Sequence, residues 1–265
     1  MNEYLEAIIL GIVQGLTEFL PVSSDGHLEL AKWILGENKT ASESFLMTVI
    51  LHFGTALAIV WVFRKAIWEI LRNITSPASK KFMLLTIISM IPAVIVGVGF
   101  EKEMTALFDK KIVLVGMLLF INGIVLTISD YLPGGNKPIT PMKALAIGIA
   151  QAVAILPGIS RSGSTISTSV ALGIDRKEAA HFSFLIVIPL IFGKIAKDIL
   201  DGTMAASQTK AGPLALGFVV SFFVGVIACS WMLSIVQKAK LRYFGYYCML
   251  IGITAIVVKL WIWPN

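Results

Sequence analysis

The stretches PVSSDGH (residues 21–27) and PGISRSGST (residues 157–165) interrupt two otherwise apolar segments of the chain, residues 4–36 and 142–174. Each apolar arm beside an interruption is only about 10 to 16 residues long, whereas a helix needs about 20 residues to cross the hydrocarbon of a bilayer. An irregular tip at membrane depth must lie inside protein or beside water. The pattern therefore predicts two re-entrant helical hairpins, which enter a membrane without crossing it.

The composition places the rest of the chain in a membrane as well. Of its 265 residues, 57% are hydrophobic and 14% are charged, and the mean hydropathy is +0.85, whereas about 25% charged residues is usual in soluble domains. Six further stretches are long and apolar enough to cross a bilayer: residues 45–63, 82–100, 112–129, 182–200, 213–236 and 243–263. The sequence thus predicts an all-α integral membrane protein with about six transmembrane helices.

The same figures exclude several other classes of protein. The abundance of apolar residues excludes intrinsic disorder, and two cysteines, Cys229 and Cys248, are too few for a disulfide-stapled secreted module. The formal net charge of +6 comes from Lys and Arg residues that are dispersed between apolar stretches. Nucleic-acid binding needs a clustered basic face, so no nucleic-acid partner is expected.

The two interrupted segments are related to each other. The stretch GIVQ at residues 11–14 matches GIAQ at residues 148–151, and Ser23 matches Ser160, both at an offset of 137 positions. A second match, at an offset of 139, pairs residues 44–54 with residues 183–193. This order predicts an internal duplication, with residues 1–137 and 138–265 each holding one hairpin and three spans. Because three crossings is an odd number, the second repeat must be inverted relative to the first.

Charge between the spans predicts the orientation in the membrane. More of the 22 Lys and Arg residues lie on the side that holds Arg64, Lys65 and Arg72 than on the other side, and the side richer in Lys and Arg normally faces the cytoplasm. Both termini and the mouth of the first hairpin are then expected outside, and the second hairpin is expected to enter from the cytoplasm.

Glu18 is the clearest candidate for chemistry, because ionisable residues inside a membrane are costly and usually functional. Gln14 lies four positions earlier, so both side chains share one helix face that ends at the first interruption. A carboxylate and an amide oxygen are hard ligands suited to Mg²⁺ or Ca²⁺ held together with phosphate oxygens. The alternative interpretation is a neutral Glu18 carboxyl that ties the hairpin together by hydrogen bonds.

Arg161 is the corresponding candidate in the second interruption. It is flanked by Ser160, Ser162, Gly163 and Thr165. A guanidinium binds phosphate with two parallel hydrogen bonds, and a Gly- and Ser-rich turn that opens a helix presents backbone N–H groups to an anion. These residues predict an anion site, although a structural ion pair between Arg161 and Glu18 across the two tips is the alternative and is compatible with it.

The remaining polar residues of the first interruption have two interpretations each. His27 can act as a general acid or base, and Ser24 can act as a nucleophile if a base is in reach. Ser23 and Asp25 precede a helix, so capping is favoured for them over catalysis. His52 has no acidic neighbour at helical spacing and is interpreted as a packing residue. We expect Asn122 to hydrogen-bond between helices.

Together, the Gln14-x-x-x-Glu18 spacing, the PVSS-x-GH stretch and the PGISRSGST stretch resemble the undecaprenyl-diphosphatase family of the bacitracin-resistance type. The length, the order of spans and the later FSFL stretch at residues 182–185 with Pro189 also fit, so the resemblance covers essentially the whole chain. It implies a multi-pass enzyme of the bacterial inner membrane that removes the terminal phosphate of undecaprenyl diphosphate, with recycling of the lipid carrier for peptidoglycan synthesis. It also implies dependence on a divalent cation and a site reached from the outer leaflet.

The resemblance assigns roles to individual residues. Gln14 and Glu18 match the family's acidic motif and metal ligands, Ser24 and His27 its proposed nucleophile and acid–base group, and Arg161 its diphosphate-binding arginine, with Ser160, Ser162, Gly163 and Thr165 as accessory groups. Two positions depart from the family pattern: Gln14, where many relatives have Glu, and Asp25, where Ser or Thr is expected. A carboxylate at position 25 either adds a metal ligand or repels a diphosphate.

A transporter of a lipid phosphate or a small anion is the alternative function, because inverted repeats with midplane hairpins are common in secondary transporters. Turnover without a gradient separates the two functions. The sequence leaves open whether Ser24 or a water molecule is the nucleophile, and whether the protein is a monomer or a homodimer.

Overall fold

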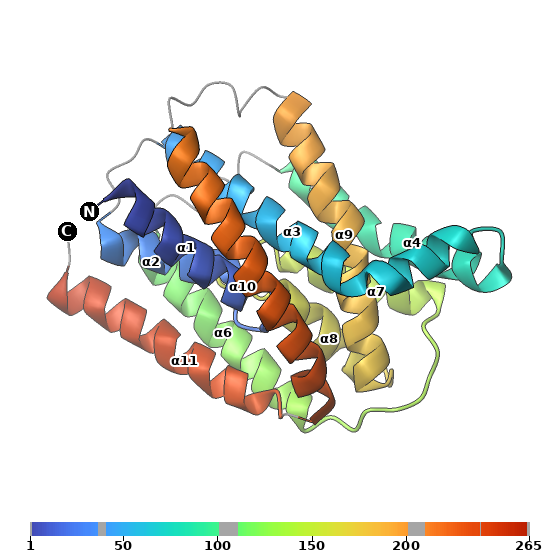
Figure 1. The fold of residues 1–265 in the computed structure, drawn as a ribbon. Helices are drawn as coiled ribbons and strands as arrows, with labels where there is room; N and C mark the ends of the chain where they lie inside the picture. The colour runs from blue at the N-terminus through green and yellow to red at the C-terminus, as the bar shows by residue number, and fades with distance from the viewer. Residues whose placement is uncertain (1, 37–40, 101–110, 201–209, 239, 264–265) are drawn as a thin grey trace.

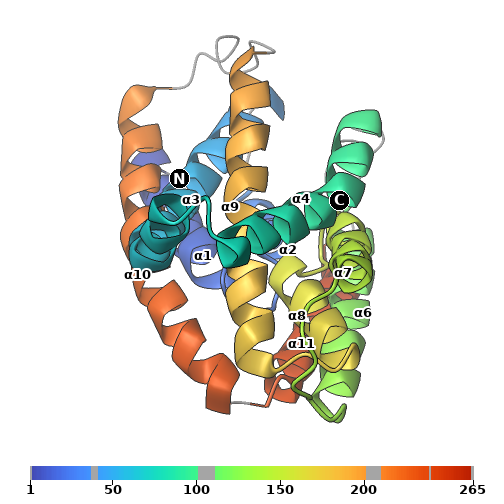
Figure 2. The same cartoon turned by 90° about the vertical axis from the view of Figure 1, so that its right-hand side faces the viewer.

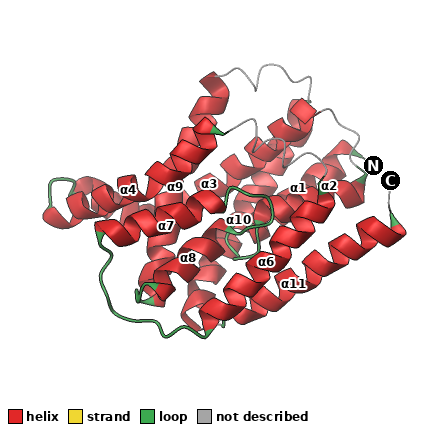
Figure 3. Cartoon of the chain, turned by 180° about the vertical axis from the view of Figure 1, so that it is seen from behind, coloured by secondary structure: helices red, strands yellow, loops and turns green. Residues whose placement is uncertain are grey.

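The computed structural model describes residues 2–36, 41–100, 111–200, 210–238 and 240–263. Within these ranges the chain forms helices and loops without strands (Figure 3). Six helices are long and apolar enough to cross a membrane. They are α3 (Ala41–Arg72), α4 (Pro77–Gly99), α6 (Ile112–Asp130), α9 (Arg176–Leu200), α10 (Ala211–Lys238) and α11 (Arg242–Val257), which continues as the π-helix η1 (Val258–Ile262). The prediction of an all-α protein with six candidate spans is confirmed.

Four shorter helices form two pairs that are separated by the polar interruptions. They are α1 (Glu3–Thr17) and α2 (Ser24–Leu35), and α7 (Pro141–Val153) and α8 (Arg161–Ala171). At the start of α2 the Ser23 hydroxyl accepts from the Gly26 N–H, and at the start of α8 the Ser160 hydroxyl accepts from the Gly163 N–H. Serine at this position satisfies one of the free N–H groups of the first turn. Both predicted interruptions are therefore breaks between helices.

The short helix pairs are packed against long helices from the other half of the chain (Figures 1 and 2). Helix α1 packs along α10, and α7 packs along α4. Both contacts depend on glycine: a Cβ added at Gly11 would lie 2.9 Å from the Gly217 carbonyl oxygen of α10, and one at Gly148 would lie 2.4 Å from the Ser89 carbonyl oxygen of α4. The absence of a side chain lets the helices approach closely, as is common in membrane proteins.

Two pairs of long helices also join the halves. Helix α6 runs along α11, and α3 packs against α9, where the rings of Phe53 and Phe192 meet edge to face with centroids 6.2 Å apart. The largest cluster of buried apolar residues lies around α9, and it includes Phe19, whose ring packs on Phe184. Phe19 follows Glu18 directly, so this packing fixes the tip that carries the candidate carboxylate.

Candidate active site

The tips of the two short helix pairs meet in the interior of the protein. The Ser23 hydroxyl accepts two backbone hydrogen bonds, one from Gly26 N at 3.3 Å in its own tip and one from Gly158 N at 3.1 Å in the other tip. Ser23 has a φ of 70°, and it is the one non-glycine residue with positive φ in the described part of the chain. Such a conformation costs free energy and persists only where the surroundings hold it. The predicted capping role of Ser23 is confirmed, and the same hydroxyl joins the two tips.

Asn122 of α6 bonds to both tips at once. Its Nδ2 donates to the Pro21 carbonyl oxygen at 3.1 Å, and its Oδ1 accepts from Ser160 N at 3.0 Å. The side chain is buried, and the partners lie in different halves of the sequence. The expectation that Asn122 hydrogen-bonds between segments is confirmed, but its link to the candidate site was not predicted.

Glu18 and Arg161 come together where the tips meet. An Arg161 guanidinium nitrogen, Nη2, donates to Glu18 Oε1, while Glu18 Oε2 accepts from Ser24 Oγ at 2.7 Å and from Gln14 Nε2 at 3.1 Å. The Glu18 side chain is only 5% exposed and that of Arg161 17%. The structure thus groups four predicted site residues around one carboxylate. It also contains the Glu18–Arg161 ion pair that was expected as the structural alternative.

Two polar atoms of this group are buried without a hydrogen-bond partner: Arg161 Nη1, a donor, and Gln14 Oε1, an acceptor. Buried polar atoms are almost always paired in native proteins, so each exception needs an explanation. A free guanidinium N–H fits a phosphate oxygen, and a free amide oxygen fits a cation. The two free atoms thus have the chemistry that suits an anion and a cation, respectively.

Gln14 and Glu18 suit the expected divalent cation if phosphate oxygens of a substrate supply further ligands. Within the described residues, no three His, Cys, Asp or Glu side chains are grouped to hold a metal on their own. Mg²⁺ is usually held by one or two carboxylates together with substrate phosphates rather than by a protein cage. The Glu18 carboxylate and the free Gln14 Oε1 supply that partial set.

His52 of α3 contacts two acidic residues of the first tip, so its interpretation as a packing residue was wrong, although it has no acidic neighbour at helical spacing. Its Nε2 lies 3.4 Å from Asp25 Oδ1 and 3.8 Å from Glu18 Oε2, and its Nδ1 lies 2.9 Å from the Thr48 carbonyl oxygen. Both acidic partners come from the first tip and not from α3. Spacing along α3 therefore carried no signal for them.

Asp25 pairs with His52, and the side-chain cap of α2 comes from Ser23, so the capping role expected for Asp25 was wrong. Burial alone would raise the pKa of Asp25. The contact with His52, together with the more distant charges of Lys194 and Lys32, outweighs burial and lowers this pKa below its usual value. Asp25 therefore carries a negative charge at neutral pH beside Ser24.

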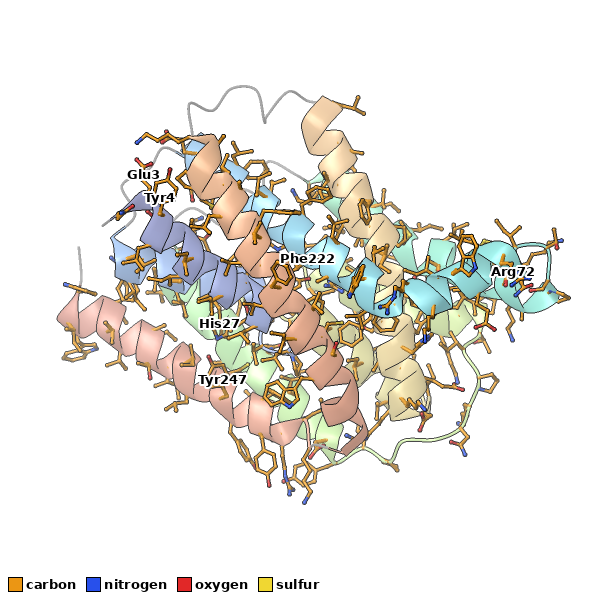
Figure 4. All side chains as sticks on the ribbon, in the orientation of Figure 1. Glu3, Tyr4, His27, Arg72, Phe222 and Tyr247 are labelled. Carbon is orange, nitrogen blue, oxygen red and sulfur yellow. The ribbon has the colours of Figure 1, made fainter. Side chains whose placement is uncertain are left out.

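His27 lies on the other side of α2 and contacts a residue that was not predicted, Tyr247 of α11 (Figure 4). The Nδ1 of His27 lies 2.8 Å from the Ser23 carbonyl oxygen, and Nε2 lies 2.9 Å from the Tyr247 hydroxyl, with the two rings stacked. Because Nδ1 faces a carbonyl, it carries the proton and Nε2 is the basic nitrogen. Burial lowers the pKa of His27, so the ring is neutral at neutral pH.

The other polar residues of the second interruption hold the start of α8. Ser162 Oγ donates to the Leu20 carbonyl oxygen of the first tip at 3.3 Å, and it also lies 3.2 Å from Ser160 Oγ. Thr165 Oγ1 shares a hydrogen bond of 2.6 Å with Ser183 Oγ of α9. These contacts fix the helix whose first residue is Arg161. Ser183 lies in the FSFL stretch at residues 182–185, but no role at the site was predicted for it.

Comparison with known proteins gives one consistent result. A family model described as bacitracin resistance protein BacA matches residues 7–254. An undecaprenyl-diphosphatase of Christiangramia forsetii is 51% identical over 258 residues, which cover 96% of this chain and 98% of that protein. Undecaprenyl-diphosphatases of Bacteroides fragilis and Korarchaeum cryptofilum are 40% and 37% identical and are covered to 98% and 97% of their lengths.

Both findings span nearly the whole chain, and they include both tips that build the candidate site. The six apolar helices agree with a multi-pass membrane protein. The chain belongs to the bacitracin resistance protein BacA family.

Proposed function

We propose that this protein is a membrane phosphatase that hydrolyses undecaprenyl diphosphate to undecaprenyl phosphate and inorganic phosphate, and so recycles the lipid carrier of peptidoglycan synthesis and confers bacitracin resistance. The names of the relatives support this activity. The observation that carries it is the unpartnered Arg161 Nη1, buried beside Glu18 where the tips meet. A buried arginine with a free donor is suited to a diphosphate oxygen.

In this proposal Arg161 and the N–H groups at the start of α8 bind the diphosphate. A helix start presents free N–H groups and a positive partial charge to an anion. The position of that helix start is fixed by the hydrogen bonds of four residues: Ser160, Ser162, Gly163 and Thr165. Phosphoryl transfer needs placement and charge neutralisation above all, which such a site provides.

We assign the divalent cation, Mg²⁺ or Ca²⁺, to Gln14 and Glu18, and Asp25 stays outside this set because its carboxylate faces His52. When bound, the cation neutralises charge on the phosphate oxygens. Ser24, or a water molecule beside it, attacks the terminal phosphorus, and the bond from this phosphorus to the bridging oxygen breaks, so that undecaprenyl phosphate leaves. If Ser24 attacks, a water molecule then hydrolyses the phosphoserine and releases inorganic phosphate. Ser24 Oγ is oriented by its hydrogen bond to Glu18 Oε2.

His27 is the proposed acid–base group, and its basic nitrogen Nε2 bonds to the Tyr247 hydroxyl. We infer that Nε2 gives up its hydrogen bond to the Tyr247 hydroxyl and bonds to the reacting group when it transfers a proton. The polyprenyl tail lies along apolar helix faces open to lipid. One such face is a groove of about 550 Å³ between α4 and α7, whose apolar lining includes Leu156, the residue before the second interruption.

We infer further that α1–α2 and α7–α8 are re-entrant hairpins in two inverted repeats, residues 1–137 and 138–265. At 1.5 Å per residue, the 15 residues of α1 are too short to cross the bilayer. The equivalent glycines Gly11 and Gly148 make equivalent close contacts with α10 and α4. Phe53 and Phe192, also equivalent, contact each other, as residues near a two-fold axis between repeats would.

We propose, from the distribution of Lys and Arg, that both termini face the outside and that the site opens to the outer leaflet. Labelling of single cysteines with a membrane-impermeant reagent in intact cells tests this orientation. The variant Arg72→Cys, at the last residue of α3, is expected to stay unlabelled, and Glu3→Cys is expected to react. The opposite pattern would contradict it.

The activity is tested by phosphate release from undecaprenyl diphosphate by detergent-purified protein, with Mg²⁺ or Ca²⁺ and with a chelator. We expect cation-dependent release that falls about a thousandfold or more in Arg161→Ala. Arg176→Ala is the matched control, because Arg176 pairs with Asp130 at 3.1 Å away from the tips. Ordinary activity of Arg161→Ala would exclude the proposed anion site, and the absence of release by folded wild-type protein would favour the transporter.

A further inference from the structure

Asp25 places a negative charge in the part of the site that must admit a diphosphate. It follows Ser24 directly, and its side chain is 34% exposed, whereas the Glu18 side chain is 5% exposed. The guanidinium of Arg161 is paired with Glu18 rather than with Asp25. A carboxylate in this position repels an anionic substrate unless another group holds and compensates it.

His52 is the group that contacts this carboxylate, with Nε2 at 3.4 Å from Asp25 Oδ1. The ring is fixed by its other nitrogen, which lies 2.9 Å from the Thr48 carbonyl oxygen one turn earlier on α3. Nδ1 therefore carries a proton, and the ring faces the carboxylates with Nε2, which donates to Asp25 when this nitrogen is protonated as well. Lys32, the nearest basic residue of α2 itself, bonds to Glu29 and Thr48 instead.

The neighbours of His52 extend this link to the metal-binding side of the site. Thr55, three residues later on α3, lies 3.3 Å from Gln14 Nε2 and donates to the His52 carbonyl oxygen at 3.0 Å. Helix α3 thus supports Gln14 through Thr55 and Asp25 through His52. The two acidic residues of the tip therefore differ in their nearest charged partners. Glu18 bonds to Arg161, whereas Asp25 lies closer to His52 of α3 than Glu18 does.

We propose that His52 is a positioning residue that holds the Asp25 carboxylate against α3, so that the diphosphate reaches Arg161 without repulsion from Asp25. This inference rests on the proposed function. It explains how a carboxylate is accommodated where a hydroxyl residue was expected. It also assigns His52 an effect on substrate binding rather than on the chemical step.

A double-mutant cycle tests the proposal, with KM and kcat measured for phosphate release from undecaprenyl diphosphate. His52→Leu leaves Asp25 without its partner, and its KM is expected to rise about tenfold, the order expected for one uncompensated charge near the diphosphate. The kcat is expected to change far less. In the Asp25→Ser background, where there is no carboxylate to hold, His52→Leu is expected to leave KM unchanged.

His52→Gln is the second variant, because an amide can still donate to Asp25, and its KM is expected to lie between those of the wild type and His52→Leu. It also keeps the test open if His52→Leu does not fold. The proposal is overturned if His52→Leu raises KM equally with and without Asp25, or if it lowers kcat and leaves KM unchanged. Wild-type protein and Arg161→Ala in the same assay separate this failure from a failure of the proposed function.

Discussion

Replacing Asn122 with leucine removes a side chain of α6 that bonds to both tips. The hydrogen bonds to the Pro21 carbonyl oxygen and from Ser160 N are lost, together with a weaker one to Cys248 Sγ at 3.5 Å, and both backbone groups remain buried. A hydrogen bond between helices in a membrane contributes about 0.6 kcal/mol on average and up to about 1.7, and a buried backbone group without a partner costs about 1–3 kcal/mol. We expect Asn122→Leu to lower the free energy of unfolding by about 2–4 kcal/mol.

Activity should fall in the same variant, because Ser160 N belongs to the residue that caps the helix of Arg161. If about 1.4–2.8 kcal/mol of the loss is felt at the site, kcat/KM falls about 10- to 100-fold. Unfolding of the purified protein in mixed micelles measures stability, and phosphate release by the folded fraction measures activity. Ile121→Leu, at an exposed neighbouring position of α6, is the control. An Asn122→Leu protein as stable and as active as this control would refute the reasoning.

The remaining predictions concern helix packing and His27. Gly148→Ala places a Cβ 2.4 Å from the Ser89 carbonyl oxygen and is expected to destabilise the protein by about 1–3 kcal/mol. Gly193→Ala meets no atom within 4 Å and should be neutral or stabilising by up to about 1 kcal/mol. Equal thermal midpoints for the two proteins would contradict this difference. Tyr247→Phe keeps the stacked ring but loses the hydroxyl bonded to His27, so kcat should fall about 3- to 10-fold without loss of stability; an unchanged kcat would remove Tyr247 from the mechanism.

Length and hydropathy were sufficient to predict the spans but not their ends. The first span was expected at residues 45–63, whereas α3 runs to Arg72. The additional turns carry Arg64, Lys65, Glu69 and Arg72 between apolar residues, so they are helical but too rich in charge for hydropathy to count them with the span. The interruptions were predictable because Pro, Gly and Ser cluster in them, and because serine before a helix accepts a hydrogen bond from a free N–H group of the first turn.

The site was predictable only where its residues share a motif. Ser24 and Arg161 lie in the two interruptions and Glu18 lies just before the first one, and the sequence placed them together because both interruptions were expected to meet. His52 and Tyr247 come from α3 and α11, whose apolar sequences do not indicate which tip they face. Only the packing of long helices around the tips brings these two side chains to Asp25 and His27.

The ion pair between the tips has a consequence for biosynthesis, since 143 residues separate Glu18 from Arg161 in the chain. At about 5–20 residues per second, the ribosome adds Arg161 about 7–30 s after Glu18. During that interval the carboxylate enters the membrane without its guanidinium. Gln14, Ser24 and His52 are made close to it in time, so we expect these groups to supply the first polar contacts of Glu18 in the nascent protein. Their substitution should therefore reduce the amount of inserted protein as well as its turnover.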